Sequence, residues 1–479
     1  KKMKHFSSKY YFDDYAKLFI ILLALFSPIL VNSYNYIDDY GRSLYGYNGL
    51  DANGRPVAAI ILWMTMWFGD VVDISPIPQI ISVALIAASA CLLKVSLERH
   101  TGYKLGILPA VFIFTAPTYL PMILFKYDSV SMAFSILTAI SAFYALGNNS
   151  FKSYALAFVL IILSMLSYQA SISIFIILTC YRCIFLSFDK CRSAVRYLIG
   201  SAIISILAIA SASLISKQFT SGGYNDTHSR LLSFSHDSID AWLSNSAKYL
   251  SMINMSYPMA WIIYAASILY VLYIVISSGD KITAIRKLLA LALAILCPSF
   301  IFLHLSLLES PVFNIRTLIG TSFAIFMAVI LFAKNTIFRK AIFLFLIAYN
   351  LTIYAATLNS IRYQMNHENN ISTLVMNDLT SERFHDVKNI YTEGRVYYPQ
   401  EVSNINRRFP VVMMLSQTYL GSNSFFGYVR LNYYLRDTKY GYSENNKSIT
   451  LVSHTTKPVI ERKYYKIWVS GNDALISFK

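Results

Sequence analysis

The sequence predicts a polytopic α-helical membrane protein with about eleven transmembrane helices and a polar C-terminal tail. Hydrophobic residues make up 56% of the 479 residues, charged residues only 14%, and the mean hydropathy is +0.49. Soluble domains carry roughly 25% charged residues, so this deficit indicates a chain solvated mainly by lipid. The apolar residues are also gathered into runs of about 20 residues, the length that crosses the hydrocarbon core of a bilayer.

The apolar runs place the expected spans along the first three quarters of the chain. The first run is too long for the core of a signal peptide and no small-residue cleavage site follows it, so we expect a retained helix. The expected spans are roughly 16–33, 77–95, 105–121, 130–147, 153–168, 171–187, 197–215, 258–277, 287–306, 317–333 and 340–358.

The basic residues of the connectors predict the orientation of the spans. Cytoplasmic loops carry an excess of Lys and Arg. The N-terminal segment and alternate connectors hold most of these residues, which places the N-terminus in the cytoplasm, and an odd number of spans then places the C-terminus outside. The connectors expected on the outer side hold only Arg42, Arg55, Lys126, Lys217, Arg230, Lys248 and Arg316.

Two domains are expected. Residues 1–358 form the transmembrane domain, with long outer loops at 34–76 and 216–257, and residues 359–479 form an outer domain that is α/β or β-rich. Alternating residues at 395–398 and 464–469 predict strands in the tail. In the first outer loop, Trp63 and Trp67 are four residues apart, which predicts a helix lying in the membrane interface.

Several classes of protein are disfavoured. The net charge of +16 does not indicate a nucleic-acid-binding protein, because the sequence contains no nucleic-acid-binding module. Neither a phosphate-binding loop nor an H-E-x-x-H or G-x-S-x-G motif is present. All five cysteines lie in or beside apolar segments, so we expect no disulfides. Cys180 and Cys183 have the spacing of zinc ligands, but without a second pair they are expected to be small buried residues.

The candidate catalytic residues are two adjacent acids, Asp38 and Asp39, directly after the first span. Adjacent like charges raise one pKa, which suits a general base that works near neutral pH. Arg42 follows and has the right charge to bind a phosphate, and Tyr40 is a candidate substrate-binding residue. The alternative is a solvated loop in which an Asp caps a helix and Arg42 is its counter-ion.

Two short outer connectors hold further candidates. Lys126, Tyr127 and Asp128 must lie at membrane depth, where Lys126 can bind a lipid phosphate. Asp128 is either a substrate-binding residue or the cap of the next helix. Tyr168 and Gln169 occupy a tight turn, in which the Gln amide either binds a sugar hydroxyl or satisfies backbone groups that the turn leaves open.

The remaining candidates lie in and near the second long outer loop. Arg316 enters a span and can reach a phosphate, or it forms an ion pair with Glu309. His228 and Arg230 lie in the loop itself and, with Glu309, are candidates for substrate binding. The ionisable residues thus gather at the outer interface, whereas a proton-coupled transporter would carry a chain of acids inside its spans.

This arrangement suits sugar transfer from a lipid-phosphate donor, because nucleotide sugars are not available outside the cytoplasm. The sequence resembles the serotype-converting O-antigen glucosyltransferases of enteric bacteria and their phages, over about residues 10–360. The motifs that carry the resemblance are Tyr36-Ile37-Asp38-Asp39-Tyr40-Gly41-Arg42, Asp73-Ile74-Ser75-Pro76-Ile77-Pro78-Gln79, Phe125-Lys126-Tyr127-Asp128-Ser129 and Ser167-Tyr168-Gln169-Ala170.

The resemblance implies a C-type glycosyltransferase fold in the bacterial inner membrane. It implies transfer of glucose from undecaprenyl-phosphate glucose to a sugar of the lipid-linked O-antigen on the periplasmic face, with inversion. The acid that acts as base in similar enzymes maps to Asp38 or Asp39, of which Asp38 is favoured. Some relatives need a divalent metal, but beyond the two acids no ligand set stands out, so no cofactor or essential metal is expected.

Three alternatives stay open on the sequence alone. The first is a transferase with a different polyprenyl-phosphate sugar as donor. The second is an O-antigen polymerase, although that would favour outer loops rich in Arg and the loop 216–257 holds only Arg230. The third is a lipid-sugar flippase or other transporter, which has no need of a polar outer tail of about 120 residues or of acids clustered on one side.

Overall fold

The computed structural model describes residues 8–479 except 33, 102–104, 149, 190, 223–226, 229, 234–235, 280–281, 422–423, 436–439 and 443–456. Six of the basic residues that predict a cytoplasmic N-terminus lie outside the described residues: Lys1, Lys2, Lys4, Lys104, Lys190 and Lys281. The chain divides into two compact units, which are treated separately below. The membrane unit is Lys1–Tyr34, Asn48–Gly69 and Ile74–Tyr354, and the C-terminal unit is Asn35–Tyr47, Asp70–Asp73 and Ala355–Lys479.

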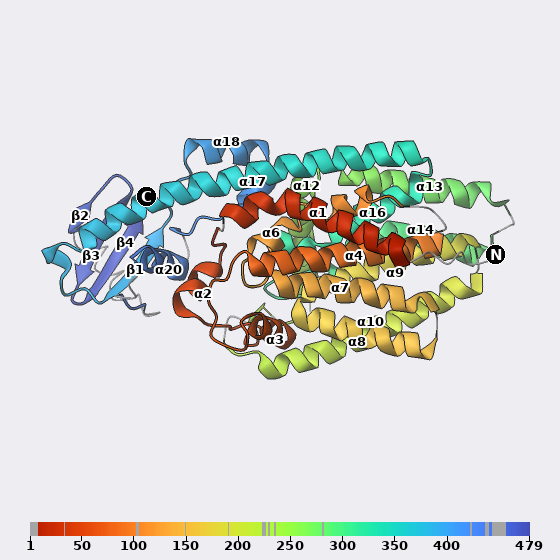
Figure 1. Cartoon of the computed structure of the whole chain (residues 1–479), viewed down its shortest axis with the longest axis horizontal. Helices are drawn as coiled ribbons and strands as arrows, with labels where there is room; N and C mark the ends of the chain where they lie inside the picture. The colour runs from red at the N-terminus through yellow and green to blue at the C-terminus, as the bar shows by residue number, and fades with distance from the viewer. Residues whose placement is uncertain are drawn as a thin grey trace. The chain divides into compact units, whose positions relative to one another are not determined.

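The membrane unit is a bundle of helices in which α4, α7 and α8 pack in succession, with α1 against α4 and α10 against α8 (Figure 1). The helices are α1 (Ser8–Asn32), α3 (Pro56–Thr65), α4 (Ile77–Thr101), α5 (Leu108–Thr115), α6 (Leu120–Leu124), α7 (Ser129–Ala145), α8 (Phe151–Ser167), α9 (Ile172–Asp189), α10 (Cys191–Phe219), α12 (His236–Ser256), α13 (Ala260–Ser277), α14 (Ala284–Leu296), α15 (Leu303–Ser306), α16 (Gly320–Phe332) and the first part of α17 (Thr336–Leu379).

Among the described residues, eight helices are long and apolar enough to cross a membrane. The expectation of a multi-pass helical membrane protein is confirmed, but the count of eleven spans is not. The expected spans 130–147 and 153–168 correspond to α7 and α8, which have 17 residues each, the short end of the spanning range. The expected span 105–121 is broken into α5 and α6, because Ala116 precedes a proline and is extended, with ψ of 145°.

Helix α3 ends at Thr65, before the second tryptophan of the expected interfacial helix. Trp67 and Phe68 both have left-handed backbone conformations, with φ of 52° and 64°, so Trp67 does not share a helical face with Trp63. Instead the Trp63 indole N–H donates to the Phe68 carbonyl oxygen at 3.0 Å, and the two rings pack edge to face. The two tryptophans are exposed, Trp67 by 88%, and their place in the membrane interface stays a prediction.

The C-terminal unit combines a small four-stranded sheet with helices (Figure 1). The strand order is β1-β4-β3-β2, with β1 parallel to β4 and the other two pairs antiparallel. The elements are α2 (Asp39–Tyr45), the second part of α17, β1 (Asn389–Gly394), α18 (Gln400–Arg408), α19 (Pro410–Leu415), α20 (Ser424–Leu435), β2 (Ile460–Glu461), β3 (Tyr465–Ser470) and β4 (Asp473–Phe478).

Two strands were expected in the tail, and one of them is confirmed. The expected strand 464–469 corresponds to β3, whose residues Tyr465 and Ile467 are buried. The expected strand 395–398 is wrong by a few residues, because β1 ends at Gly394, where a positive φ of 74° turns the chain out of the sheet.

The short segment Asn35–Tyr47 packs as part of the C-terminal unit, although more than 300 residues separate it from Ala355, where the main part of that unit begins. Its helix α2 contacts α20, and Tyr40 is a member of the same hydrophobic core as Ile371 and Val375 of α17 and Ile390 of β1. The segment that carries the two adjacent acids is thus built into the core of the C-terminal unit.

Candidate active site

The two adjacent acids differ in burial and in hydrogen bonding. Asp39 is fully buried, and its carboxylate accepts a hydrogen bond from the Tyr36 backbone N–H at 3.0 Å. Asp38 is partly exposed and precedes α2, yet its side chain makes no capping hydrogen bond. Within the described part of the chain, no hydrogen bond or ion pair occupies the Asp38 carboxylate. The capping alternative therefore does not describe Asp38, whose carboxylate is available to a substrate.

Tyr40 is a core residue of the C-terminal unit. Its ring is held edge to face between Tyr419 and Tyr433, at centroid distances of 4.8 and 5.0 Å, and the Arg430 guanidinium lies 4.7 Å from its centre. Burial raises the pKa of the Tyr40 phenol well above its ordinary value, so the hydroxyl keeps its proton. Tyr40 anchors the segment that carries the acids, and direct binding of substrate by its side chain stays a prediction.

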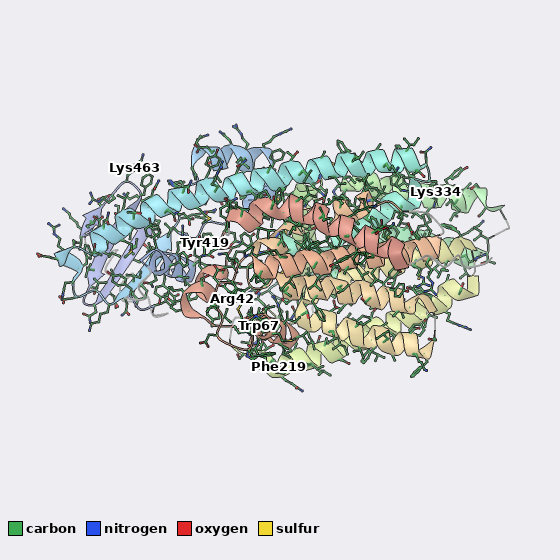
Figure 2. All side chains as sticks on the ribbon, viewed as in Figure 1. Arg42, Trp67, Phe219, Lys334, Tyr419 and Lys463 are labelled. Atoms are coloured by element: carbon green, nitrogen blue, oxygen red, sulfur yellow. The ribbon has the colours of Figure 1, made fainter. Side chains whose placement is uncertain are left out.

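Arg42 is 2% exposed and lies in the middle of α2 (Figure 2). The helix ends two turns after it begins, because Gly46 adopts a left-handed conformation and donates its N–H to the Arg42 carbonyl oxygen at 2.9 Å. So deep a position favours the counter-ion alternative for Arg42, since a buried guanidinium needs neighbouring acceptors. Its contact with a phosphate stays a prediction.

The connector between α6 and α7 is buried in the membrane unit, and its depth in the membrane stays a prediction. Lys126, Tyr127 and Asp128 are exposed by only 4%, 2% and 2%. Asp128 precedes α7 but its side chain makes no capping hydrogen bond, so the capping alternative is not observed here either. The first turn of α7 is closed instead by the Asp128 backbone carbonyl, which accepts hydrogen bonds from the Ser131 hydroxyl and the Met132 N–H.

A cluster of charged and aromatic groups surrounds Tyr168 in the membrane unit. The Arg316 guanidinium lies 4.6 Å from the centre of the Phe125 ring, and the Arg55 guanidinium lies 5.2 Å from the centre of the Tyr168 ring. Arg316, Arg55 and Asp128 all act electrostatically on the Tyr168 phenol. That hydroxyl is buried and has no hydrogen-bond partner among the described residues. The fold thus brings Arg316, Asp128 and Tyr168 into one region of the membrane unit.

Arg55 is the member of this cluster that the sequence analysis did not single out. Its Nε donates to the Gln169 side-chain oxygen at 3.2 Å, and the Gln169 amide nitrogen donates to the Gly54 carbonyl at 3.4 Å. Both ends of the Gln169 amide are therefore used by residues 54 and 55, which favours the structural alternative for Gln169. In the sequence, the only signal for Arg55 was that basic residues are rare in the connectors expected on the outer side.

The candidates in and near the loop 216–257 meet across a short antiparallel bridge between Leu231 and Leu308. The Glu309 backbone N–H donates to the Arg230 carbonyl oxygen at 2.9 Å, and a ring nitrogen of His228 contacts the Ser310 carbonyl oxygen. The side chains of Arg230 and Glu309 are exposed. The fold thus brings these three candidates side by side at the surface of the membrane unit, where sugar binding by them stays a prediction.

Cysteines and candidate metal ligands were also located. Cys91, Cys180, Cys183 and Cys297 are free thiols, and the side chain of Cys191 lies outside the described residues. In the part of the chain that the structure describes, no group of three or more His, Cys, Asp or Glu side chains is placed to hold a metal ion.

The apolar helices and the polar groups at their ends define a multi-pass membrane protein. Sequence comparison then gives the family: the chain belongs to the glucosyl transferase GtrII family, whose profile matches residues 27–327. This membership confirms the resemblance seen in the motifs and makes the chain a member of a glycosyltransferase family.

One curated relative is a phage protein. The chain is 23% identical over 249 residues to an uncharacterised 55.3 kDa protein of the gtrB 5′ region of Salmonella phage P22, and the match covers 50% of each chain. The chain thus spans about half the length of this relative. No solved structure gives a significant match.

Proposed function

We propose that the protein transfers glucose from undecaprenyl-phosphate glucose to a sugar of the lipid-linked O-antigen, on the periplasmic face of the bacterial inner membrane. Membership of the GtrII family supports glucosyl transfer in O-antigen modification. The excess of basic residues in the opposite connectors supports the periplasmic placement of Asp38, Lys126 and Arg316.

The observation that carries this proposal is the contrast between Asp38 and Asp39. One acid of the pair is buried and closes a turn, whereas the other is partly exposed and occupied by no described residue. In the proposed reaction Asp38 accepts the proton of the acceptor hydroxyl while that oxygen forms a bond to C1 of the glucose. The bond from C1 to the donor phosphate breaks, the phosphate leaves with the electron pair, and the configuration at C1 is inverted.

The leaving phosphate needs cations, because charge develops on its oxygen as the bond breaks. We assign this role to Lys126 and Arg316, with Arg42 as a further candidate. Lys126 is 4% exposed, and a cation withdrawn from water interacts more strongly with a phosphate than an exposed one does. The Tyr168 hydroxyl beside Arg316 is a further donor for a phosphate oxygen.

The sugars of donor and acceptor are assigned to the remaining polar candidates. Tyr127 and Asp128 lie beside Lys126 in the chain, and His228, Arg230 and Glu309 lie together at the surface of the membrane unit. Carboxylates and hydroxyls of these kinds bind sugar hydroxyls through hydrogen bonds. No metal is assigned a role in this mechanism.

Glucose transfer by the purified protein tests the proposal. The protein is placed in nanodiscs with synthetic undecaprenyl-phosphate glucose and a lipid-linked O-antigen, and the product is analysed by mass spectrometry and by NMR of the new linkage. We expect one hexose per modified acceptor sugar, in the configuration opposite to that of the donor. Elongated acceptor without added glucose would favour a polymerase, and translocation of the donor without transfer would favour a flippase.

A further inference from the structure

Ile37, the residue directly before the proposed base, has a strained backbone. Its φ is 51°, in the left-handed region, and it is buried with 7% exposure. A β-branched residue is rarely found there because its side chain collides with its own backbone, and such a conformation persists only where surrounding groups hold it in place. Because Ile37 immediately precedes Asp38, its conformation sets the direction in which the Asp38 carboxylate points.

The groups that hold this turn come largely from the C-terminal part of the same unit. The Ile37 N–H donates to the Tyr419 hydroxyl at 2.9 Å, and the Tyr36 hydroxyl donates to the Leu415 carbonyl oxygen at 3.0 Å. Within the turn itself, the Tyr36 N–H donates to the Asp39 carboxylate. Of these contacts, the bond to Tyr419 acts on the strained residue directly.

Tyr419 is itself fixed in position. Its backbone N–H donates at 2.8 Å to a carboxylate oxygen of Glu368, a fully buried residue of α17. The other carboxylate oxygen of Glu368 lies 3.6 Å from the Arg430 guanidinium, which covers one face of the Tyr40 ring. Burial also raises the pKa of the Tyr419 phenol well above its ordinary value, so the hydroxyl stays neutral and keeps the same hydrogen bond across the physiological range.

We propose that Tyr419 is a positioning residue for the Asp38 base: its hydroxyl keeps Ile37 in the left-handed conformation and thereby aims the Asp38 carboxylate at the acceptor hydroxyl. This inference rests on the proposed function, in which Asp38 is the base. It gives the C-terminal unit a part in catalysis through the orientation of one backbone segment, without contact between Tyr419 and the substrate.

A double-mutant cycle tests the proposal. Tyr419→Phe keeps the ring against Tyr40 and removes only the hydroxyl, so kcat should fall about 2- to 10-fold, the range expected for one hydrogen bond, with the donor KM unchanged. Ile37→Gly removes the strain, because glycine adopts the left-handed conformation without a steric cost. In the Ile37→Gly background the further effect of Tyr419→Phe should therefore shrink to within about twofold.

The matched control is Tyr433→Phe. Its ring packs against Tyr40 from another side at 5.0 Å, and its hydroxyl makes no hydrogen bond with any described residue, so kcat should be unchanged. A purely structural role of Tyr419 would lower thermal stability by the same amount in both backgrounds and leave the two kcat effects additive. If Tyr419→Phe fails to fold, the double variant is compared with Ile37→Gly alone. The two kcat values should then agree within about twofold, because a glycine at position 37 does not depend on the bond to Tyr419.

Asp38→Asn is measured in the same assay to separate two kinds of failure. If Asp38→Asn is inactive and the effects of Tyr419→Phe and Ile37→Gly on kcat are additive, only this inference is overturned. Wild-type kcat in Tyr419→Phe overturns it equally. If Asp38→Asn keeps wild-type turnover, the base of the proposed function is wrong and the inference falls with it. Loss of kcat in Tyr419→Phe, together with an effect of no more than about twofold when Tyr419→Phe is added to Ile37→Gly, supports the inference.

Discussion

The Asp39 carboxylate accepts a hydrogen bond from the Tyr36 backbone N–H at 3.0 Å, which closes the turn that precedes α2. Successive side chains cannot point the same way, so a pair of adjacent acids offers at most one carboxylate to a given substrate group. In this chain the acid used by the turn is the fully buried one, and Asp38 is the partly exposed one. The division of roles between them is therefore open to direct test.

Replacement of the proposed base should abolish turnover. Asp38→Asn keeps the size of the side chain and removes its ability to accept a proton, so kcat should fall by about 10²–10⁴ while donor binding survives. Asp39→Asn should affect binding more than turnover, since the Asp38 carboxylate stays in place and the Asn amide oxygen can still accept from the Tyr36 N–H. Both variants are assayed for glucose transfer and for donor binding. If both keep most activity, the base lies elsewhere, and Asp128 or Glu309 becomes the candidate.

Loss of a phosphate-binding cation should weaken the use of donor. Lys126→Ala and Arg316→Ala should each raise the donor concentration for half-maximal rate about 10- to 150-fold, the range for a charge-assisted hydrogen bond. Lys248→Ala is the matched control, since Lys248 is an exposed cation that lies over the Phe313 ring, 4.9 Å from its centre. Unchanged donor dependence in both test variants would move the phosphate site away from these residues, towards Arg42.

Gln169 should prove to be a structural residue. Gln169→Leu removes the acceptor of Arg55 Nε and the donor to the Gly54 carbonyl. Each lost hydrogen bond costs about 0.5–1.5 kcal/mol, since the Gly54 carbonyl keeps the Ser216 hydroxyl as a donor, so the thermal midpoint of the detergent-solubilised protein should fall modestly. The donor KM of the folded fraction should change little. A variant of normal stability with a much higher KM would instead assign Gln169 to sugar binding.

The C-terminus should lie on the periplasmic side. Because basic residues are concentrated in the connectors assigned to the cytoplasm, a periplasm-active reporter fused after Lys479 should be active and a cytoplasm-active one silent. A fusion at Lys340, which lies in a connector assigned to the cytoplasm, is the control and should give the opposite pattern. The reverse pattern would mean that the number of spans is even.

Chelation of divalent metals should leave transfer unchanged. The proposed chemistry uses a carboxylate and cationic side chains, and one of the two adjacent acids is already used by the Tyr36 N–H. Activity is measured after exhaustive treatment with EDTA and after return of Mg²⁺ or Mn²⁺. Loss of activity that either ion restores would assign a metal to the site and make the adjacent acids its first candidate ligands.

The sequence by itself determined the membrane character of the chain, since apolar runs of spanning length are a local property. It also determined β3, whose alternation is local, and it drew attention to the motif around Asp38. The break between α5 and α6 was in principle readable from proline, because a proline restricts the residue before it.

Only the tertiary structure decided which partners these residues have. The bond from Ile37 to Tyr419 joins residues 382 positions apart, and that from Arg55 to Gln169 joins residues 114 positions apart. Neither leaves a periodic pattern in the sequence, because the strain at Ile37 and the burial of Asp39 arise from packing against distant segments. Local composition fixes which segments enter lipid, whereas the direction of a single carboxylate depends on long-range contacts that only the folded chain brings together.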